Sequence, residues 1–235
     1  SLYYQPLTGY YLTIPQFRRS GIPHQSASVQ IIKAAQRYDG ATRSTLVSNQ
    51  SCEVWFAETT VKLTPKTTAP KIQSQRIRIA CAKNESQSFQ LVVRPKRQLA
   101  LTGIRVGDLN DGSSRISSDF VSVQAVEYVP IRKPSNFTPI RYLGLIGDPL
   151  VPVASAELSP ERGNQIYWVT VQVAPEVAAG TYKGTVKILF KDRTPLAVPI
   201  HLTVYDFELP EYSGLQASLD ADFFQRRYED DDTII

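Results

Sequence analysis

The sequence contains no methionine and only two cysteines, two histidines and two tryptophans among its 235 residues. Because the initiator methionine is missing, we expect residue 1 not to be the translated start and the chain to be a processed product or a piece of a longer protein. The two histidines, His24 and His201, lie far in sequence from either cysteine, which argues against a zinc site built from both residue types. We therefore expect no metal and no other cofactor.

Long apolar runs are also missing from the chain. None approaches the roughly 18 residues that a membrane-spanning helix needs, so we expect no membrane span. Helical spacing of apolar residues is confined to Ser28–Tyr38, which Asp39-Gly40 would end. The formal net charge is +4. The lysines and arginines are scattered along the chain and form no block, so the charge by itself predicts no nucleic-acid partner.

The residue types that are abundant favour β-structure. Val, Ile, Tyr, Thr and Phe suit pleated surfaces, and 16 prolines with 12 glycines supply turns. Polar and apolar residues alternate with the period of a strand in Gln75–Cys81 and Phe120–Ile131. Three closing strands are predicted at Gln165–Val173, Thr181–Phe190 and Leu196–Phe207. Strands at this spacing predict an all-β fold, an immunoglobulin-like antiparallel β-sandwich of about eight strands with an extended N-terminal arm.

The chain is predicted to have three parts. Residues 1–50, with many Tyr, Gln, Ser and Arg, would form an arm that lies on a neighbour, or the end of a preceding domain. Residues 51–210 form the predicted sandwich, and residues 211–235 a linker toward a C-terminal domain outside this chain. Within the sandwich, Arg132–Asn164 reads as an unusually long loop, which we expect to be functional or to pack against a partner. Asn110-Asp111-Gly112 predicts a plain turn.

Two features indicate a secreted, extracellular glycoprotein. Cys52 and Cys81 fall in predicted strands, and an even cysteine count in a secreted chain permits one disulfide, with two buried free thiols as the alternative. Asn49, Asn84 and Asn136 each begin an N-x-Ser/Thr sequon, more than chance would give, although coincidence in a Ser/Thr-rich sequence stays open. Asn84 and its neighbour Glu85 could instead hydrogen-bond the turn between two strands, a role that conflicts with glycosylation of Asn84.

The closing strands carry a family resemblance. The runs WVTVQVAPEVAAGTYKGTVKILF, from Trp168, and VPIHLTVYDFELPE, from Val198, are similar to the N-terminal β-sandwich of family-123 glycoside hydrolases. Three further runs resemble the same domain in the same order: EVWFAETTVKLTP from Glu53, CAKNESQSFQLVVRP from Cys81, and GDPLVPV from Gly147. The resemblance covers about Glu53 to Pro210. It implies that a (β/α)8 barrel follows the sandwich and carries an adjacent Asp-Glu pair that cleaves N-acetylhexosaminides.

The chain itself lacks catalytic motifs. It has no Gly-x-Ser-x-Gly elbow, no phosphate-binding glycine loop and no histidine metal pair, so we assign no catalytic residue. Trp55, Tyr142 and Trp168 are candidate contacts to a sugar or a partner, although core packing is the alternative for both tryptophans.

Three functions compete on this evidence. The first is a non-catalytic accessory sandwich of a secreted glycoside hydrolase-like protein, whose partner is the C-terminal barrel. The second is a structural glycoprotein module that contacts neighbouring subunits in an extracellular assembly. The third is a carbohydrate-binding module whose partners are glycans.

Overall fold

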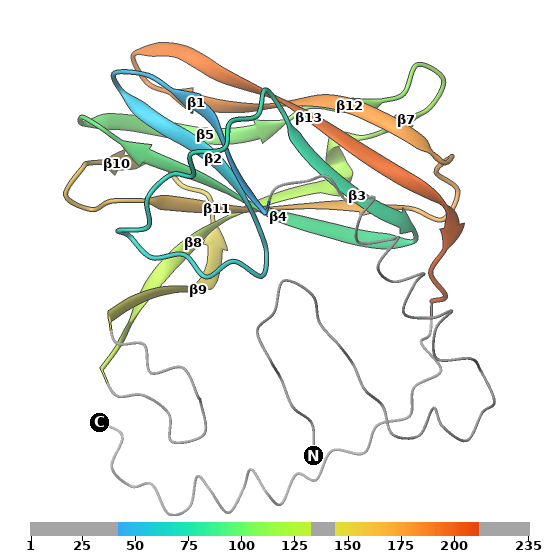
Figure 1. Ribbon diagram of the computed structural model, residues 1–235. Coiled ribbons are helices and arrows are strands. Elements are labelled where there is room, and N and C mark those ends of the chain that lie inside the picture. Colours follow the sequence, from blue (N-terminus) through green and yellow to red (C-terminus); the bar gives the residue numbers. More distant parts are fainter. Residues whose placement is uncertain (1–41, 133–143, 212–235) are drawn as a thin grey trace, which may run out of the picture. The chain divides into compact units, whose positions relative to one another are not determined.

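The computed structural model describes residues 42–132 and 144–211, which form two facing β-sheets (Figure 1). The strands of the first sheet, in spatial order, are β1 (Arg43–Ser48), β2 (Cys52–Glu58), β4 (Glu85–Pro95), β11 (Gln165–Val173), β8 (Val121–Ile131) and β9 (Gly144–Pro152). Those of the second sheet are β10 (Ala156–Leu158), β5 (Leu99–Val106), β12 (Gly180–Phe190), β13 (Arg193–Glu208) and β3 (Ile77–Lys83). The predicted all-β sandwich is confirmed.

Smaller elements complete the described part of the chain. The two-residue strands β6 (Leu109–Asn110) and β7 (Arg115–Ile116) pair with each other, and β6 also pairs with β12. A single 3-10 turn, Ser118–Phe120, precedes β8. The strand pairs are antiparallel except for β3 with β13, which run parallel. No helix in the described residues is long and apolar enough to cross a membrane.

The main core lies between the two sheets and follows from strand alternation. In β11, Tyr167, Val169 and Val171 point inward and are almost fully buried. The inward residues of β12 and β13 meet them from the second sheet, and Tyr182 is among them. The hydroxyl of Tyr182 donates to the carbonyl oxygen of Ala178 at 2.9 Å, so this buried ring keeps a hydrogen-bond partner.

A second apolar cluster lies on the outer face of the first sheet. Its buried members are Trp55, Ala57, Leu63, Val92, Val126 and Ile166. Leu63 comes from residues 59–76, the cover segment, which connects β2 to β3 across this face. Because both faces of the first sheet are buried here, β2 and β4 carry nearly continuous apolar runs and lack a clean alternation.

Gln90 on β4 and Asn164, which directly precedes β11, hold the cover segment in place through hydrogen bonds. Gln90 Nε2 donates to the carbonyl oxygens of Glu58 and Val61, at 2.7 and 2.9 Å. Asn164 Nδ2 donates to the carbonyl oxygens of Thr64 and Thr67, at 2.9 and 2.7 Å. The bonds to Val61, Thr64 and Thr67 satisfy carbonyls of the cover segment that packing would otherwise remove from water, and the bond to Glu58 satisfies the last carbonyl of β2. The cover segment is therefore fixed at several points along its length.

Two boundaries differ from the sequence prediction. Strand β1 begins at Arg43, so the sandwich starts before residue 51 and includes part of the predicted arm. Strands β9 and β10 lie inside Arg132–Asn164, which was predicted to be one long loop. Pro149 and Pro152 suggested a loop, but prolines are tolerated on β9 because it is an edge strand. The predicted helix at 28–38, the rest of the arm and nearly all of 211–235 lie outside the described residues.

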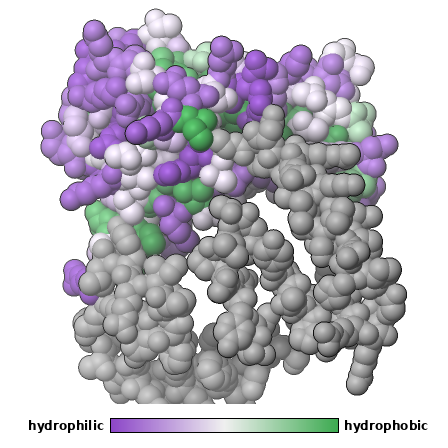
Figure 2. Space-filling model, in the orientation of Figure 1, coloured by the Kyte–Doolittle hydropathy of each residue, from purple (hydrophilic) through white to green (hydrophobic). Residues whose placement is uncertain are grey.

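The described surface is mostly hydrophilic in the orientation of Figure 1, with scattered apolar residues (Figure 2). The turn predicted at Asn110-Asp111-Gly112 is confirmed. Gly112 has a φ of 105°, and Asp111 Oδ1 accepts from the backbone amides of Ser113 and Ser114 at 2.8 and 2.6 Å. The carboxylate closes the turn through the backbone, as in an Asx turn.

Candidate functional site

The connection from β3 to β4 is a very tight turn that passes from one sheet to the other. Asn84 alone separates the two strands, with a φ of 58°, a conformation that asparagine tolerates better than most residues. Glu85 Oε2 accepts from the backbone amide of Ala82 at 2.6 Å and closes the turn. The sequence-based expectation that Asn84 and Glu85 hydrogen-bond this turn is therefore correct for Glu85.

Asn84 instead bonds the end of β13. Its Nδ2 donates to the carbonyl oxygen of Leu209 at 2.9 Å, and the backbone amide of Leu209 donates to the carbonyl oxygen of Lys83 at 3.0 Å. Lys83 Nζ also pairs with Asp206 Oδ1 at 2.8 Å. We call these residues, Lys83, Asn84, Asp206 and Leu209, the exit clamp. Both backbone polar groups of Leu209 are thus held immediately before Pro210, which fixes the direction of the chain there.

The electrostatics of the exit clamp are those of a surface pair. The Asp206 side chain is 84% exposed. The hydrogen bond from Lys83, and then its charge, lower the pKa of Asp206 below its usual value. Exposed ion pairs of this kind contribute little to the free energy of unfolding.

Exposed apolar side chains surround the exit point. Tyr205 and Phe207 are 46% and 55% exposed, and Leu209 is 37% exposed. The two rings stack on each other, with centroids 6.0 Å apart and an interplanar angle of 9°. Rings that stack while exposed form a preformed apolar surface next to the point where the chain leaves the sandwich.

Comparison with known families gives one decisive result. Residues 56–190, more than half of the chain, match the model of the glycoside hydrolase 123 N-terminal domain. The chain belongs to this family. The resemblance described from the sequence is thereby confirmed.

Comparison with solved structures agrees on the fold. The sandwich is similar to part of a family 123 glycoside hydrolase from Clostridium perfringens, studied for glycolipid glycan hydrolysis, with 11% identity and a TM-score of 0.54. The match covers 68% of this chain and 28% of that enzyme, so this chain spans well under two thirds of the hydrolase's length. A weaker match is Spo0M, a sporulation control protein from Bacillus subtilis, with 8% identity, a TM-score of 0.34, and coverage of 67% and 50%. No curated protein matches the sequence.

The candidate aromatic contacts do not form one platform. Trp55 is fully buried beneath the cover segment, so it cannot stack on a sugar, and this corrects its proposed role as a contact. Trp168 is half-buried on the same face and lines a small cavity of about 200 Å³ with Asp148 and Lys62 among its neighbours. Tyr142 lies outside the described residues, as does the sequon residue Asn136.

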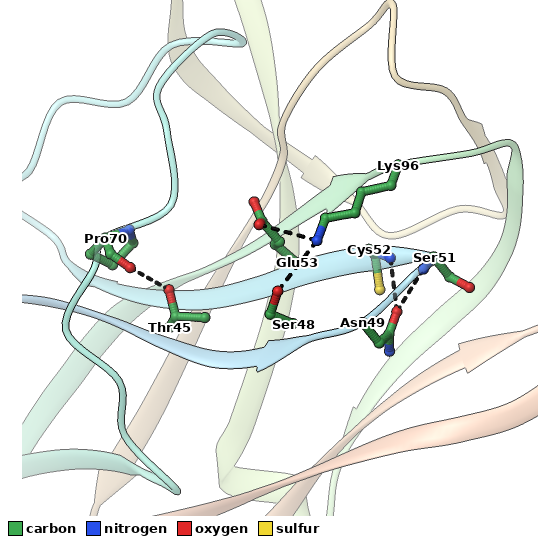
Figure 3. Close-up of polar contacts among 8 residues, drawn as sticks. All are labelled: Thr45, Ser48, Asn49, Ser51, Cys52, Glu53, Pro70 and Lys96. Atoms are coloured by element: carbon green, nitrogen blue, oxygen red, sulfur yellow. Dashed lines mark hydrogen bonds and ion pairs between the residues drawn. The ribbon is translucent and has the colours of Figure 1, made fainter.

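The two other sequons differ in their surroundings. Asn49 is exposed at the turn between β1 and β2, where its Oδ1 accepts from the backbone amides of Ser51 and Cys52 at 2.8 and 3.0 Å (Figure 3). Its Nδ2, the atom that carries an N-linked glycan, has no hydrogen bond within the described residues. The Nδ2 of Asn84 is engaged by Leu209. Of the two, only Asn49 presents an exposed and unengaged amide nitrogen.

The predicted bridge between Cys52 and Cys81 is absent from the structure, where both cysteines are buried free thiols. Cys52 lies opposite Pro95, at the last residue of β4. Cys81 lies on β3, close to the turn that leads into the first residue of β4. A strand of this length spans about 35 Å, and a disulfide needs Cα atoms within about 7 Å. Burial raises the pKa of both thiols, to about 12 for Cys81, which keeps them protonated and unreactive.

The carboxyl groups with shifted pKa values are structural. Backbone hydrogen bonds from Ser118 lower the pKa of Asp108, and those from Ser114 and Ser113 lower that of Asp111. Within residues 42–132 and 144–211, no group of three or more His, Cys, Asp or Glu residues is placed to hold a metal ion. The candidate site is therefore the exit clamp, whose geometry suits positioning of the chain.

Proposed function

We propose that this chain is the non-catalytic accessory sandwich of a secreted glycoside hydrolase-like protein, and that it orients a catalytic domain following Pro210. Family membership supports the presence of a further catalytic domain in the parent protein. The observation that carries the proposal is the exit clamp, which holds Leu209 through both its amide and its carbonyl group. By the family resemblance, the parent would cleave N-acetylhexosaminides.

Four carboxyl groups of the sandwich have shifted pKa values, and none of these four has the raised pKa of a glycosidase general acid. A glycosidase general acid needs a raised pKa, because it must carry a proton near neutral pH. The pKa values of Asp108, Asp111, Glu161 and Asp206 are all lowered, the first two chiefly by backbone hydrogen bonds. These four groups are fixed in the ionised form, which suits turns and the exit clamp.

The exposed apolar patch supports a domain contact at the same place. Tyr205, Phe207 and Leu209 lie within five positions at the exit point and are each more than one third exposed. A following domain that begins after Pro210 would meet this patch first. The clamp would set the direction of entry and the patch would add apolar contact area.

The proposal is tested in the full-length parent protein with the variant Asn84→Gly. Glycine keeps the positive φ of the turn and removes only the side chain that holds Leu209. We expect faster amide exchange at residues 205–209 and a severalfold lower kcat/KM toward an aryl N-acetylhexosaminide. Ser86→Ala, an exposed change on the neighbouring strand, is the matched control.

Two results would contradict the proposal. One is a full-length parent with no activity on N-acetylhexosaminides. The other is an Asn84→Gly variant whose exchange rises at residues 205–209 while turnover stays at the wild-type value, because the orientation of the chain would then be irrelevant to the reaction.

Secretion is a separate part of the proposal, supported by the exposed amide of Asn49. Expression of the full chain through a eukaryotic secretory pathway should add a glycan at Asn49 and none at Asn84. The mass of the secreted protein, compared with that of Asn49→Gln and Asn84→Gln variants, reads this out. Retention inside the cell, or a mass unchanged by Asn49→Gln, would count against it.

A further inference from the structure

The outer face of the second sheet gathers basic side chains from four different strands. Lys183 on β12 lies directly opposite His201 on β13, and His201 lies opposite Arg78 on β3. Two positions further along the same side of β12, beyond Thr185, Lys187 lies opposite Arg105 on β5. Arg78, Arg105, Lys183 and Lys187 are all exposed. We call these four residues together with His201 the basic face.

The basic face lacks neutralising acidic residues. Strands β3, β5 and β12 contain no Asp or Glu, and those of β13 are Asp206 and Glu208 at its very end. Asp206 is already paired with Lys83 in the exit clamp. Within the described residues, Lys183, Lys187 and Arg105 form no ion pair. The charges of Lys183, Lys187 and Arg105 are therefore available to an external anion.

This arrangement is unfavourable for folding alone. Like charges directly opposite each other on neighbouring strands are destabilising, and Lys187 with Arg105 is such a pair. The positions could hold threonine, as Thr181 and Thr185 do on the same side of β12. The repulsion between Lys187 and Arg105 lowers stability, and no ion pair with either residue within the described residues offsets it. A ligand that binds these charges would explain their presence.

The positive charges of the basic face also affect His201. Burial, followed by the charges of Arg76, Lys183 and Arg78, lowers the pKa of His201 below its usual value. The imidazole is therefore uncharged at neutral pH and can offer a hydrogen bond at the centre of the basic face. The lasting charges there are those of lysine and arginine.

An aromatic surface lies along the same strand. Tyr205 follows His201 and Thr203 at two-residue spacing on β13, next to the inward-pointing Val204, so its ring faces outward. Phe207 stacks on it. Because the following domain would contact these rings under the proposed function, the ligand of the basic face would be held by the ammonium and guanidinium groups, which donate to sulfate or carboxylate oxygens.

We propose that the basic face binds an acidic linear polysaccharide, with sulfate or carboxylate groups on the lysines and arginines of two rows that are separated by the row of Thr185. The rows cross several strands, so the site is broad and open and suits a polymer better than a small molecule. The choice of a polysaccharide over another polyanion rests on the proposed function, since the parent would act on glycans. Binding at this site would localise the parent protein to material that is rich in acidic polysaccharides.

The test uses the full chain and fluorescently labelled heparin, with binding followed by anisotropy at low and at physiological ionic strength. We expect the double variant Lys183→Ala/Lys187→Ala to weaken binding by about tenfold or more and to lower the salt dependence by about one ion per lysine. The control, Lys62→Ala/Lys71→Ala, removes the same charge from the exposed cover segment of the other sheet. Neutral dextran should not bind.

Three results would overturn the proposal. The first is that heparin does not bind the wild-type chain. The second is that both double variants lose affinity equally, which would show that binding depends only on the net charge of the chain. Tighter binding of double-stranded DNA than of heparin would assign the face to nucleic acid. None of these measurements uses enzyme turnover. Failure of the heparin test would therefore not affect the proposed role of the exit clamp. An inactive parent protein would remove only the argument that the bound polyanion is a glycan.

Discussion

The two outer faces of the sandwich have opposite characters. The first sheet buries a tryptophan-centred apolar cluster under the cover segment, and amide side chains hold that segment down. On the outer face of the second sheet, the described lysine and arginine side chains are exposed. One face therefore completes the hydrophobic burial of the fold, whereas the other presents exposed positive charges.

Trp55→Ala should produce the largest effect, because it empties the centre of the covered face. Trp55 is fully buried, and truncation of a large buried aromatic costs about 3–5 kcal/mol of the free energy of unfolding. Lys187→Ala on the outer face of the second sheet should change it by no more than about 0.5 kcal/mol. Urea unfolding of both variants measures the contrast.

A milder variant keeps this comparison usable if Trp55→Ala does not fold. The indole Nε1 of Trp55 has no hydrogen-bond partner among the described residues. Trp55→Phe therefore loses volume but no hydrogen bond and should cost less than the alanine variant. Equal stability of Trp55→Phe and Lys187→Ala would contradict the assignment of the first sheet as the structural face.

Asn164→Ala should have the next largest effect, because it releases the cover segment. Asn164 is 2% exposed and donates to the carbonyl oxygens of Thr64 and Thr67. Leaving those carbonyls unsatisfied should cost about 2 kcal/mol and speed amide exchange across residues 61–67. Asn164→Asp should be at least as damaging, since a carboxylate oxygen would face two acceptors. An unchanged exchange rate in the cover segment would contradict this role.

Lys187→Glu should act in the opposite direction, by stabilising the protein. It replaces a like-charged pair with Arg105 by an opposite-charged one, worth about 0.2–1 kcal/mol. The same variant should weaken heparin binding, a trade of function for stability. Lys71→Glu, an exposed change in the cover segment, is the control and should leave both quantities near wild type. Loss of stability in Lys187→Glu would show that Lys187 has a structural role.

Much of the fold follows from the sequence because strand alternation is local. The closing strands and the β12–β13 hairpin could be predicted from period-two patterns and turn residues. The continuous apolar run Val54–Ala57 does signal burial on both faces, but it does not say which segment covers the outer one. The missed strands β1 and β9 are edge strands, where polar residues and prolines weaken the pattern.

The sites were harder to predict because they depend on register. Arg78, Arg105, Lys183 and Lys187 lie on three strands that are far apart in sequence, so they look scattered along the chain. Only the pairing of β3, β13, β12 and β5 aligns them on one face. The absent disulfide has the same cause. A spacing of cysteines in sequence does not show that Cys52 and Cys81 lie toward opposite ends of β4.

The smallest expected effect is a difference in how the cover segment and the exit clamp respond to acid. Gln90 and Asn164 hold the cover segment through amides that do not titrate, whereas Lys83 holds Asp206 through a carboxylate. The pKa of Asp206 is lower in the folded state than its usual value of about 3.9, so the pair adds stability above that pH and loses it as the pH falls through the lowered pKa.

Acidification below about pH 4 should therefore speed exchange at residues 205–209 before residues 61–67 respond. Asp206→Asn removes the titrating group, so its exit segment should exchange faster than wild type at neutral pH and show no further step on acidification. If both segments loosened together in the wild-type chain, the exit clamp would not be an independent, charge-dependent element. If only residues 205–209 responded, acid would release the Lys83–Asp206 contact of the exit clamp and leave the cover segment in place on the first sheet.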